Sequence, residues 1–405
     1  MKVFYNLPKK VLFCNTCVNS NQYPASIPEF THQKNRKNAK YINFNSERIC
    51  DGCLQAEIKK NINWKKREVR LLKLLDVYRK KNGEYDCVVP GSGGKDSAYA
   101  AHVLKYKYGM NPLTVTWPPI LYTDYGKENF DNWLKVGGFD NVTFKPNPRV
   151  MKILTRLAIL NLLHPFQTFI LGQKNLAPTL AEKFNIKLVF YGENEAEYGN
   201  PIKDNTNSMR SDSFFTMKSI NNTFLSGMKV HELIKKFKLR LSDLAHFLPM
   251  KKDNFNKSKI QIHYLGYYLK WIPQEAYYYA VKNTGFKARP QRTEGTYSKY
   301  NSIDDKIDDL HYYTRFLKFG IGRATDDASQ EIRNNHINRE EAKLLVKRFD
   351  GEFPKKYFNE IMDYLEIRPN QFFKLCDKFR SPHLWKKVGS AWKLRHTVNK
   401  DGTDD

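Results

Sequence analysis

The sequence contains no long apolar run and no targeting segment. None of its stretches reaches the roughly 18 consecutive apolar residues that a membrane-spanning helix needs. The first residues, MKVFYNLPKKVLFC, lack the apolar core and the cleavage site of a signal peptide. Internal repeats and low-complexity linkers are absent as well. These absences argue against a membrane protein, a secreted protein or a repeat array, and we expect a soluble cytoplasmic protein.

Acidic residues are few relative to basic ones. The chain has 42 Asp and Glu against 68 Lys and Arg, which gives a formal net charge of +26. A charge of this size is compatible with an anionic partner such as a nucleotide, a sugar acid or RNA. The basic residues are dispersed in short clusters, such as NWKKREVR and PMKKDNFNKSK, without a long basic tail. Composition therefore does not identify the partner, and we expect neither a membrane nor a nucleic acid to be one.

Three regions follow one another along the 405 residues. A hydrophobic content of 41% with 14% aromatic residues is enough for a large core divided over two or three units. Residues 1–75 hold four of the six cysteines and then a basic segment with the apolar spacing of a helix. Residues 76–245 alternate apolar runs with helical patterns. Residues 246–405 are expected to be mainly helical, with helices in NREEAKLLVKRF and PKKYFNEIMDYLEI, and to contact the substrate or a partner.

The middle region has the pattern of a parallel α/β sheet. A strand, a glycine-rich turn, a helix and another strand follow one another in this order. We therefore expect a Rossmann-like domain. The predicted helices are SAYAAHVLKYKYG and APTLAEKFN, and the predicted strands are YDCVVP, PLTVTW, VTFKP, QTFILG and KLVFYG.

Four of the cysteines form two pairs, Cys14-x-x-Cys17 and Cys50-x-x-Cys53. Four thiolates in this arrangement can close tetrahedrally around Zn²⁺, and the residues between them tolerate tight turns. Such a closed site has no open position for chemistry, so we expect a structural zinc. Redox pairs and an iron–sulfur cluster are the alternatives. The remaining two cysteines lie in a predicted strand and a predicted helix and are expected to pack in the core: Cys87 and Cys376.

The segment CVVPGSGGKDSAY contains a glycine-rich loop between a predicted strand and a predicted helix. A Walker loop would need Ser or Thr after its Gly-Lys pair, and a G-x-G-x-x-G loop would need a third glycine, but Asp96 occupies both positions. The backbone N–H groups of the loop can face an oxyanion, and the start of the helix adds a partial positive charge. Lys95 would add a point charge, and Asp96 would cap the helix or hold Mg²⁺. The candidate phosphate-binding residues are Ser92, Gly93, Gly94, Lys95, Asp96 and Ser97.

Further candidates follow other predicted strands, because ligands of an open parallel sheet bind beyond the carboxyl ends of its strands. Trp117 follows the second strand and could contact adenine, although a tryptophan packed in the core is equally consistent with the pattern. The acids of YGENEAEYG, Glu193 and Glu197, could bind Mg²⁺ or contact the substrate. Two candidate ATP-binding residues close the run QTFILG: Gly172 and Gln173.

The loop SGGKDS resembles the SGGxDS signature of the PP-loop ATP pyrophosphatases, whose fold is that of adenine nucleotide alpha hydrolases. This family cleaves ATP between the α- and β-phosphates and transfers AMP to an oxygen, which a nitrogen or sulfur nucleophile then displaces. The segments YTDYGKENFDN, YGENEAEYG and NSIDDKIDDLHYYTRFLKFGIGRATDDASQEIR resemble the N-acetyl sugar amidotransferases of the PseA and WbpG types, as do the paired cysteines. The resemblance extends over nearly the whole chain.

The resemblance implies an enzyme that uses ATP and Mg²⁺ to convert the N-acetyl group of a bacterial surface sugar to an acetamidino group. The acceptor would be a free or nucleotide-linked sugar, such as pseudaminic acid, legionaminic acid or an O-antigen sugar, destined for flagellin or lipopolysaccharide. Lys95, Asp96, Glu193 and Asn194 would be catalytic, and Glu197 would contact the sugar. Three arginines near glycine and hydroxyl residues could bind a carboxylate or a phosphate, with solvated surface arginines as the alternative: Arg289, Arg292 and Arg323.

No cysteine has the glycine-flanked context of a glutaminase nucleophile. We therefore expect ammonia to come from a separate glutaminase subunit. The resemblance also implies such a subunit, similar to the histidine-pathway glutaminase with its synthase-barrel partner. The alternative function is a PP-loop tRNA-modifying enzyme of the thiolase or lysidine-synthetase type, which would suit both the positive charge and the cysteine pairs.

Overall fold

A five-stranded sheet with all strands parallel forms the centre of the molecule. The computed structural model describes residues 1–34, 40–193, 197 and 207–400. The strand order is β3-β2-β1-β4-β9. These strands are β1 (Cys87–Pro90), β2 (Pro112–Thr116), β3 (Asn141–Thr143), β4 (Leu188–Tyr191) and β9 (Gln261–Tyr264).

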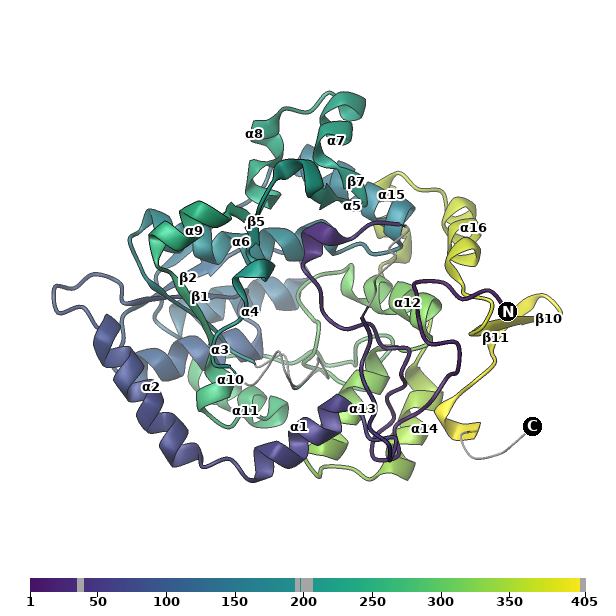
Figure 1. Cartoon of the computed structure of the whole chain (residues 1–405), viewed down its shortest axis with the longest axis horizontal. Coiled ribbons are helices and arrows are strands. Elements are labelled where there is room, and N and C mark those ends of the chain that lie inside the picture. Colours follow the sequence, from purple (N-terminus) through teal and green to yellow (C-terminus); the bar gives the residue numbers. More distant parts are fainter. Residues whose placement is uncertain (35–39, 194–196, 198–206, 401–405) are drawn as a thin grey trace.

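Successive strand residues face two different helical layers (Figure 1). Val88 packs in one core cluster with residues of α5 (Pro148–Leu162) and α6 (Gln167–Lys183). Val89, the next residue, packs in a second cluster on the other face. Because both faces are covered, the central strands are apolar at almost every position, as is typical of parallel sheets. The helices of the second layer are α2 (Trp64–Tyr78), α3 (Lys95–His102), α4 (Asp124–Lys135) and α11 (Pro273–Thr284).

The order of the strands reverses between β1 and β4. After β1 the chain moves outward to β2 and β3, and it then returns to place β4 on the other side of β1. Open α/β sheets bind ligands at such a point, in the crevice beyond the carboxyl ends of the strands. The Rossmann-like class predicted from the sequence is therefore confirmed, and the glycine-rich loop lies at this crevice because it follows β1.

One predicted strand is wrong. The run QTFILG forms the start of helix α6, which continues through the predicted helix APTLAEK to Lys183. A short apolar run does not distinguish a buried strand from a buried helix segment. Helix α6 contacts β1, β2 and β4 and buries residues around most of its circumference, so its sequence lacks a clear polar face.

The basic segment, expected as one helix, forms two. Helix α1 (Asp51–Lys60) carries the second cysteine pair at its start, and α2 begins three residues after α1 ends. The break occurs where the side chain of Asn63 accepts a hydrogen bond from the backbone N–H of Lys66 at 2.9 Å. This contact caps the N-terminus of α2.

The described residues between β4 and β9 form short elements, some of which lie at the top of Figure 1. The fifth strand, β9, comes after them and therefore lies beyond the boundary expected at residue 245. Its sequence, QIHY, has too few apolar residues to mark a strand. The elements of this segment are β5 (Thr216–Met217) paired with β8 (Met250–Lys251), β6 (Phe224–Leu225) paired with β7 (Met228–Lys229), α7 (Val230–Phe237), α8 (Leu241–Leu244), α9 (Lys252–Ser258), and 3₁₀ turns at Asp212–Phe214, Ile220–Asn222 and Ala245–Phe247.

The region after β9 is mainly helical, as expected, and the N-terminal segment packs on it (Figure 1). The backbone N–H of Phe4 donates a hydrogen bond to Ser381 Oγ at 2.9 Å, and Gln22 Oε1 lies 2.9 Å from His383 Nε2. The predicted helices at 338–349 and 354–367 are present. The elements are α10 (Leu265–Tyr268), α12 (Asp308–Phe319), α13 (Arg323–Arg333), α14 (Arg339–Phe349), α15 (Phe358–Leu365), α16 (Pro369–Phe379), the hairpin β10 (Trp385–Val388) with β11 (Ala391–Leu394), and a 3₁₀ turn at Val398–Lys400.

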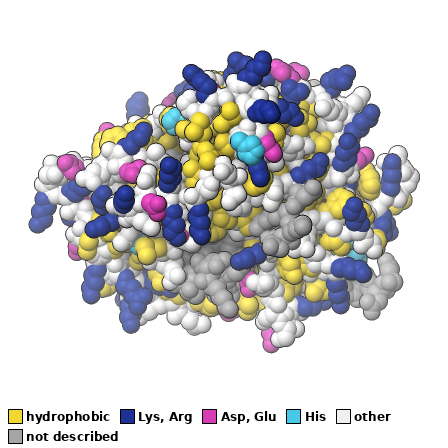
Figure 2. Space-filling view, turned by 45° about the horizontal axis from the view of Figure 1, so that its top comes forward, with side chains coloured by type: hydrophobic (Ala, Val, Ile, Leu, Met, Phe, Trp, Pro, Cys, Tyr) yellow, Lys and Arg dark blue, Asp and Glu magenta, His cyan; other side chains and the backbone are white. Residues whose placement is uncertain are grey.

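The surface agrees with the dispersed charge of the sequence. Within the described part of the chain, no helix is both long and apolar enough to cross a membrane. Figure 2 shows Lys and Arg side chains scattered over one face, among apolar and uncharged side chains, rather than gathered in one stripe.

Candidate functional site

The glycine-rich loop joins β1 to α3, as the sequence predicts. Gly93 has a φ of +86°, and a Cβ atom there would lie 2.6 Å from the carbonyl oxygen of Asn129. Only glycine fits this position. Gly94 precedes the first residue of α3, and Ser97 Oγ donates a hydrogen bond to the Gly94 carbonyl at 3.0 Å. The loop thus directs the start of a helix toward the crevice, which is the arrangement that binds phosphate groups.

A cavity of about 320 Å³ lies at the carboxyl ends of β1, β2 and β4. Its volume is within the usual range for small-molecule sites. The cavity brings together most of the residues that the sequence predicts for ATP and catalysis: Ser92, Gly94, Asp96, Ser97, Trp117, Gln173 and Glu193. Three other predicted residues, Gly93, Lys95 and Gly172, are not among those that line it. Asn194 lies outside the described residues.

Trp117 forms an aromatic wall of this cavity and is 3% exposed. Gly172 lies against it in helix α6, where a Cβ atom would be 2.3 Å from Trp117 Cζ2. The absence of a side chain at Gly172 therefore makes room for the indole, rather than for a ligand after a strand. Trp117 Nε1 is buried without a hydrogen-bond partner. A buried donor of this kind is available to an acceptor on a bound ligand.

Lys95 and Asp96 form a charged pair at one end of the cavity. Lys95 Nζ lies 2.5 Å from Asp96 Oδ2, and Trp271 Nε1 donates a hydrogen bond to Asp96 Oδ1 at 3.0 Å. The ammonium group is also 5.7 Å from the centre of the Trp271 ring. In this arrangement Lys95 offsets the charge of Asp96, and it does not reach into the cavity.

Glu193 faces Asp96 across the cavity end. Burial raises the pKa of Glu193 to about 7, and the charge of Asp96 acts in the same direction. Two carboxylates that repel each other in a cavity are the donors that a Mg²⁺ ion prefers. These two residues fit the divalent cation that the sequence predicts at Asp96.

Sequence reasoning missed two cations of the cavity, Lys174 and Arg210. Burial lowers the pKa of Lys174 to about 8 and that of Arg210 to about 10. Arg210 Nη1 donates a hydrogen bond to Tyr264 at 2.9 Å, and its guanidinium lies 3.7 Å from the centre of the Phe214 ring. The only sequence signal was that Lys174 directly follows Gly172-Gln173, and Arg210 lies in no motif. Two cations in one cavity favour an anionic ligand.

Asp304 connects the C-terminal region to the loop. Ser92 Oγ donates a hydrogen bond to Asp304 Oδ2 at 2.8 Å. The neighbouring Asp305 accepts hydrogen bonds from the backbone N–H groups of Ile120 at 2.6 Å and Leu121 at 3.3 Å, just after β2. Both acids precede helix α12, which begins at Asp308. The spacing of the acids in SIDDKIDD indicates the acidic first turn of a helix, but it did not predict the contact with the loop.

The predicted sugar-binding arginines make contacts within the protein. Arg289 is 4% exposed, and its Nε has no hydrogen-bond partner. Arg292 forms two hydrogen bonds of 2.6 Å with the carboxylate of Glu352. Arg323 Nε donates to Asp327 at 2.9 Å. None of the three is among the residues that line this cavity, so their contact with substrate stays a prediction.

The predicted acid Glu197 also has a protein partner. Its carboxylate lies 2.8 Å from Lys59 Nζ, and its carbonyl accepts a hydrogen bond from Arg333 Nη1 at 3.0 Å. These contacts join α1 to α13. A role of Glu197 in substrate binding also stays a prediction.

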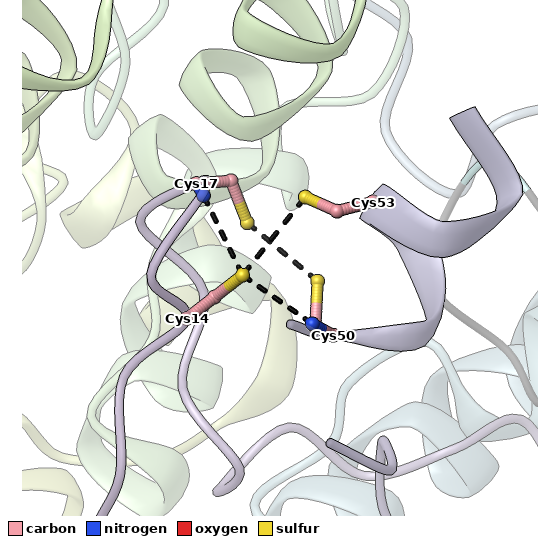
Figure 3. A group of neighbouring side chains, drawn as sticks. All are labelled: Cys14, Cys17, Cys50 and Cys53. Carbon is pink, nitrogen blue, oxygen red and sulfur yellow. Dashed lines mark hydrogen bonds between the residues drawn. The ribbon is translucent and has the colours of Figure 1, made fainter. Parts of the chain in front are cut away.

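The four paired cysteines converge on one point (Figure 3). Their sulfur atoms all lie within 4.8 Å of one another, with 3.9 Å between Cys14 and Cys53 and 3.6 Å between Cys17 and Cys50. Sulfurs bound tetrahedrally to Zn²⁺ at about 2.3 Å are separated by about 3.8 Å. The backbone N–H groups of Cys17 and Cys50 both point at Cys14 Sγ, at 3.5 and 3.3 Å. The cluster therefore has the donors, the spacing and the amide contacts of a closed four-thiolate metal site.

The C-terminal region completes this cluster. Arg333, the last residue of α13, places Nη2 3.6 Å from the sulfurs of both Cys17 and Cys50. Gly52 makes room for it, because a Cβ atom there would lie 2.5 Å from Arg333 Nη2. Arg339 donates hydrogen bonds to the carbonyls of Cys14 and Cys17 at 2.9 and 3.1 Å. No signal in the sequence identified these arginines.

The fold and the site define the class of the protein. It is an α/β protein with an SGGxDS loop at the switch point of its parallel sheet, four clustered cysteines at its N-terminal end and a helical C-terminal region. Residues 294–399 match the family model described as the C-terminal domain of WbpG-like LPS biosynthesis proteins. The chain thus carries a WbpG-like C-terminal domain, and the WbpG-type resemblance seen in the sequence is confirmed there.

Two further comparisons cover other shares of the chain. The chain is 38% identical over 79 residues to an uncharacterized protein of Methanocaldococcus jannaschii, which is 20% of this chain and 28% of that protein. A solved structure, NMN synthetase from Francisella tularensis, matches with a TM-score of 0.26 and 16% identity, over 49% of this chain and 85% of the other.

Proposed function

We propose that this protein is an ATP-dependent amidotransferase that converts the N-acetyl group of a sugar to an acetamidino group. One observation carries the proposal: Ser92 of the SGGKDS loop donates a hydrogen bond to Asp304, which belongs to the WbpG-like domain. The nucleotide loop and the domain of the LPS biosynthesis family are thus parts of one site. This supports a sugar, rather than an unrelated acceptor, as the partner of ATP.

The cavity offers groups that could bind the different parts of an ATP molecule. Trp117 offers an apolar wall and an unpaired N–H at one end. The loop and the start of α3 offer backbone donors at the other. Lys174 and Arg210 would stabilise the phosphate charges, because both cations line the cavity.

The first step would transfer AMP to the amide oxygen of the acetamido group. That oxygen attacks the α-phosphorus, the bond from the α-phosphorus to the bridging oxygen breaks, and pyrophosphate leaves with the electron pair. The product is an O-adenylated imidate. This step converts an amide oxygen, which is a poor leaving group, into the oxygen of a phosphate ester.

In the second step ammonia attacks the imidate carbon with its lone pair. The bond from this carbon to oxygen breaks, and AMP leaves with the former amide oxygen. Loss of the surplus protons from nitrogen leaves the acetamidine, which is protonated at neutral pH. Neither step requires an oxidant or a reductant.

The metal sites have different roles in this proposal. Asp96 and Glu193 would hold Mg²⁺, which when bound supplies positive charge beside the departing pyrophosphate. The four cysteines would hold a structural Zn²⁺ that fixes α1 against the N-terminal loop and, through Arg333, against the WbpG-like domain.

The ammonia would come from a glutaminase subunit. The two cysteines outside the cluster, Cys87 and Cys376, are buried, and burial raises the pKa of both thiols above the ordinary value. Neither is suited to attack glutamine. The acceptor would be a free or nucleotide-linked sugar acid, which suits the positive charge of the chain.

The test is to incubate the purified chain with ATP, Mg²⁺ and a panel of acetamido sugars, with either ammonium or glutamine. Mass spectrometry should detect replacement of one oxygen by NH only with ammonium, together with AMP and pyrophosphate. Product formation from glutamine by the isolated chain would contradict the separate glutaminase. Salt-sensitive tRNA adenylation without any sugar product would contradict the proposal and favour the tRNA-modifying class.

A further inference from the structure

Three metal-binding side chains meet at a second place, outside both sites described above. Glu29 and His32 lie in and just after the 3₁₀ turn Glu29–Thr31, and His164 lies between α5 and α6. One ligand atom from each residue lies within 4.8 Å of the other two. Two imidazoles and one carboxylate form a donor set that transition metals use in proteins.

The distances between these atoms match those of atoms that share a metal. Glu29 Oε2 lies 3.1 Å from His32 Nε2 and 3.7 Å from His164 Nε2. Ligands at about 2.1 Å from a tetrahedral Zn²⁺ are about 3.4 Å apart, in the middle of the two observed values. The site therefore needs no large rearrangement to accept an ion.

Two polar atoms of the cluster are buried and have no hydrogen-bond partner. Glu29 is 8% exposed, yet its Oε2 has no hydrogen-bond partner, even though two imidazole nitrogens lie nearby. His164 Nδ1 is also buried without a partner. The Glu29 carboxylate thus lies within ion-pair distance of both imidazoles, where it could share a metal ion with them.

The surrounding residues hold the cluster in place. Gln167 is fully buried, donates a hydrogen bond to the Glu29 carbonyl at 2.7 Å and accepts one from the backbone N–H of Ser226 at 2.6 Å. The ring of His164 stacks on that of His311, with centroids 5.0 Å apart. Ligands that are held in place in this way lose little conformational entropy when they bind an ion.

Two lysines, Lys174 and Lys318, interact electrostatically with Glu29 and would oppose a cation. Lys174 also lines the ATP cavity, which places the cluster beside that cavity.

We propose that Glu29, His32 and His164 bind one divalent transition metal ion, with Zn²⁺ favoured by the donor set. Three protein ligands leave a coordination position open for water or for an oxygen of a bound molecule. This site is separate from the four-cysteine cluster and from the Asp96–Glu193 pair, and it does not depend on the proposed reaction.

The experiment measures metal binding by the full chain. Protein is dialysed against free Zn²⁺, and separately against Co²⁺ as a spectroscopic probe, and bound metal is counted. One equivalent of Co²⁺ should show the intense thiolate charge-transfer band of the cysteine cluster. A second equivalent should show only the weaker visible bands of nitrogen and oxygen ligands.

The variants Glu29→Gln, His32→Gln and His164→Gln should each weaken the second equivalent by about 100-fold or more and leave the thiolate band unchanged. The unchanged band also reports that each variant is folded. His231→Gln, which alters an exposed histidine, is the matched control and should retain both equivalents. Absence of a second equivalent in the native chain, or its full retention in the three variants, would overturn the site.

Discussion

At the scale of single residues, the cavity brings together cationic and anionic side chains that have little access to water. Lys174 and Arg210 lie in the same cavity as Asp96 and Glu193. Burial lowers the pKa of the two cations and raises that of Glu193. Several groups with perturbed pKa values in one cavity are typical of a functional site.

Lys174→Gln is expected to weaken ATP binding by about ten- to a hundred-fold, because it removes one charge-assisted hydrogen bond to a phosphate. Lys183→Gln, on an exposed position of the same helix α6, is the matched control and should bind ATP like the native chain. Titration calorimetry with a non-hydrolysable ATP analogue measures both. Equal affinities in the two variants would remove Lys174 from the nucleotide site.

Glu193 should make stability depend on pH when Mg²⁺ is absent. The folded-state pKa of about 7 lies above the ordinary value of 4.5. The protonated carboxyl therefore contributes stability below pH 4.5, and this contribution is lost as the pH rises to about 7. Glu193→Gln, which cannot ionise, should gain in melting temperature over the native chain across this interval.

Added Mg²⁺ should reduce the difference in melting temperature between Glu193→Gln and the native chain, because the ion favours the ionised carboxylate. Glu182→Gln, at an exposed position, provides the control and should follow the native curve. Parallel melting curves of the native chain and Glu193→Gln at all pH values would show that Glu193 is not buried beside Asp96.

At the scale of elements, the four-cysteine cluster contacts helix α13 through the side chain of Arg333. Arg333→Met should lower the metal affinity of the cysteine cluster by about ten- to a hundred-fold, because it removes the cation next to the sulfurs of Cys17 and Cys50. Arg348→Met, at an exposed position of α14, is the control. Competition with a zinc chelator measures the affinity.

Gly52→Ala offers an independent perturbation of the same contact. Its Cβ would collide with the Arg333 guanidinium, so it should reproduce the loss of metal affinity while leaving every charged residue in place. Native affinity in both variants would show that Arg333 does not support the cluster.

The contact between Ser92 and Asp304 should couple the loop to the WbpG-like domain. Ser92→Ala and Asp304→Ala should each slow the reaction, and the double variant should be little slower than either, with a coupling of about 0.5–3 kcal/mol. Asp131→Ala, on the exposed side of α4, should couple with neither. Fully additive effects of Ser92→Ala and Asp304→Ala would mean that the hydrogen bond plays no part in catalysis.

Much of the element order could be predicted from the sequence. Strands β1, β2, β3 and β4 were marked by short apolar runs next to turns, and the loop was marked by its glycines. The run QTFILG was misassigned because a helix buried on most sides has no polar periodicity. Strand β9 was missed because its pairing with β4, rather than its composition, makes it a strand.

The candidate site was predictable only where a motif marked it. Four of the six predicted loop residues meet Trp117, Gln173 and Glu193 in the cavity as expected. Lys174, Arg210 and Asp304 come from positions whose proximity depends on the whole fold, and no local pattern shows that. The proposed metal site of Glu29, His32 and His164 also depends on the whole fold, because Glu29 and His164 come from distant segments of the chain.

At the scale of the whole molecule, the N-terminal region contacts the C-terminal region, which in turn contacts the glycine-rich loop. The N-terminal segment contacts Ser381 and His383, its cysteine cluster contacts Arg333 and Arg339, and the C-terminal domain contacts the loop through Asp304. The three regions expected from the sequence are therefore in contact with one another. This arrangement favours a single reaction at the loop rather than separate activities in separate domains.

The central claim is that the amide oxygen of an acetamido sugar takes up AMP and then leaves with it. The most direct test supplies the sugar with a heavy oxygen isotope in its acetyl carbonyl, together with ATP, Mg²⁺ and ammonium, and measures the mass of the released AMP. We expect AMP to gain the heavy oxygen in step with acetamidino sugar formation. AMP that carries only oxygen from ATP or water, while the acetamidino sugar forms, would contradict it.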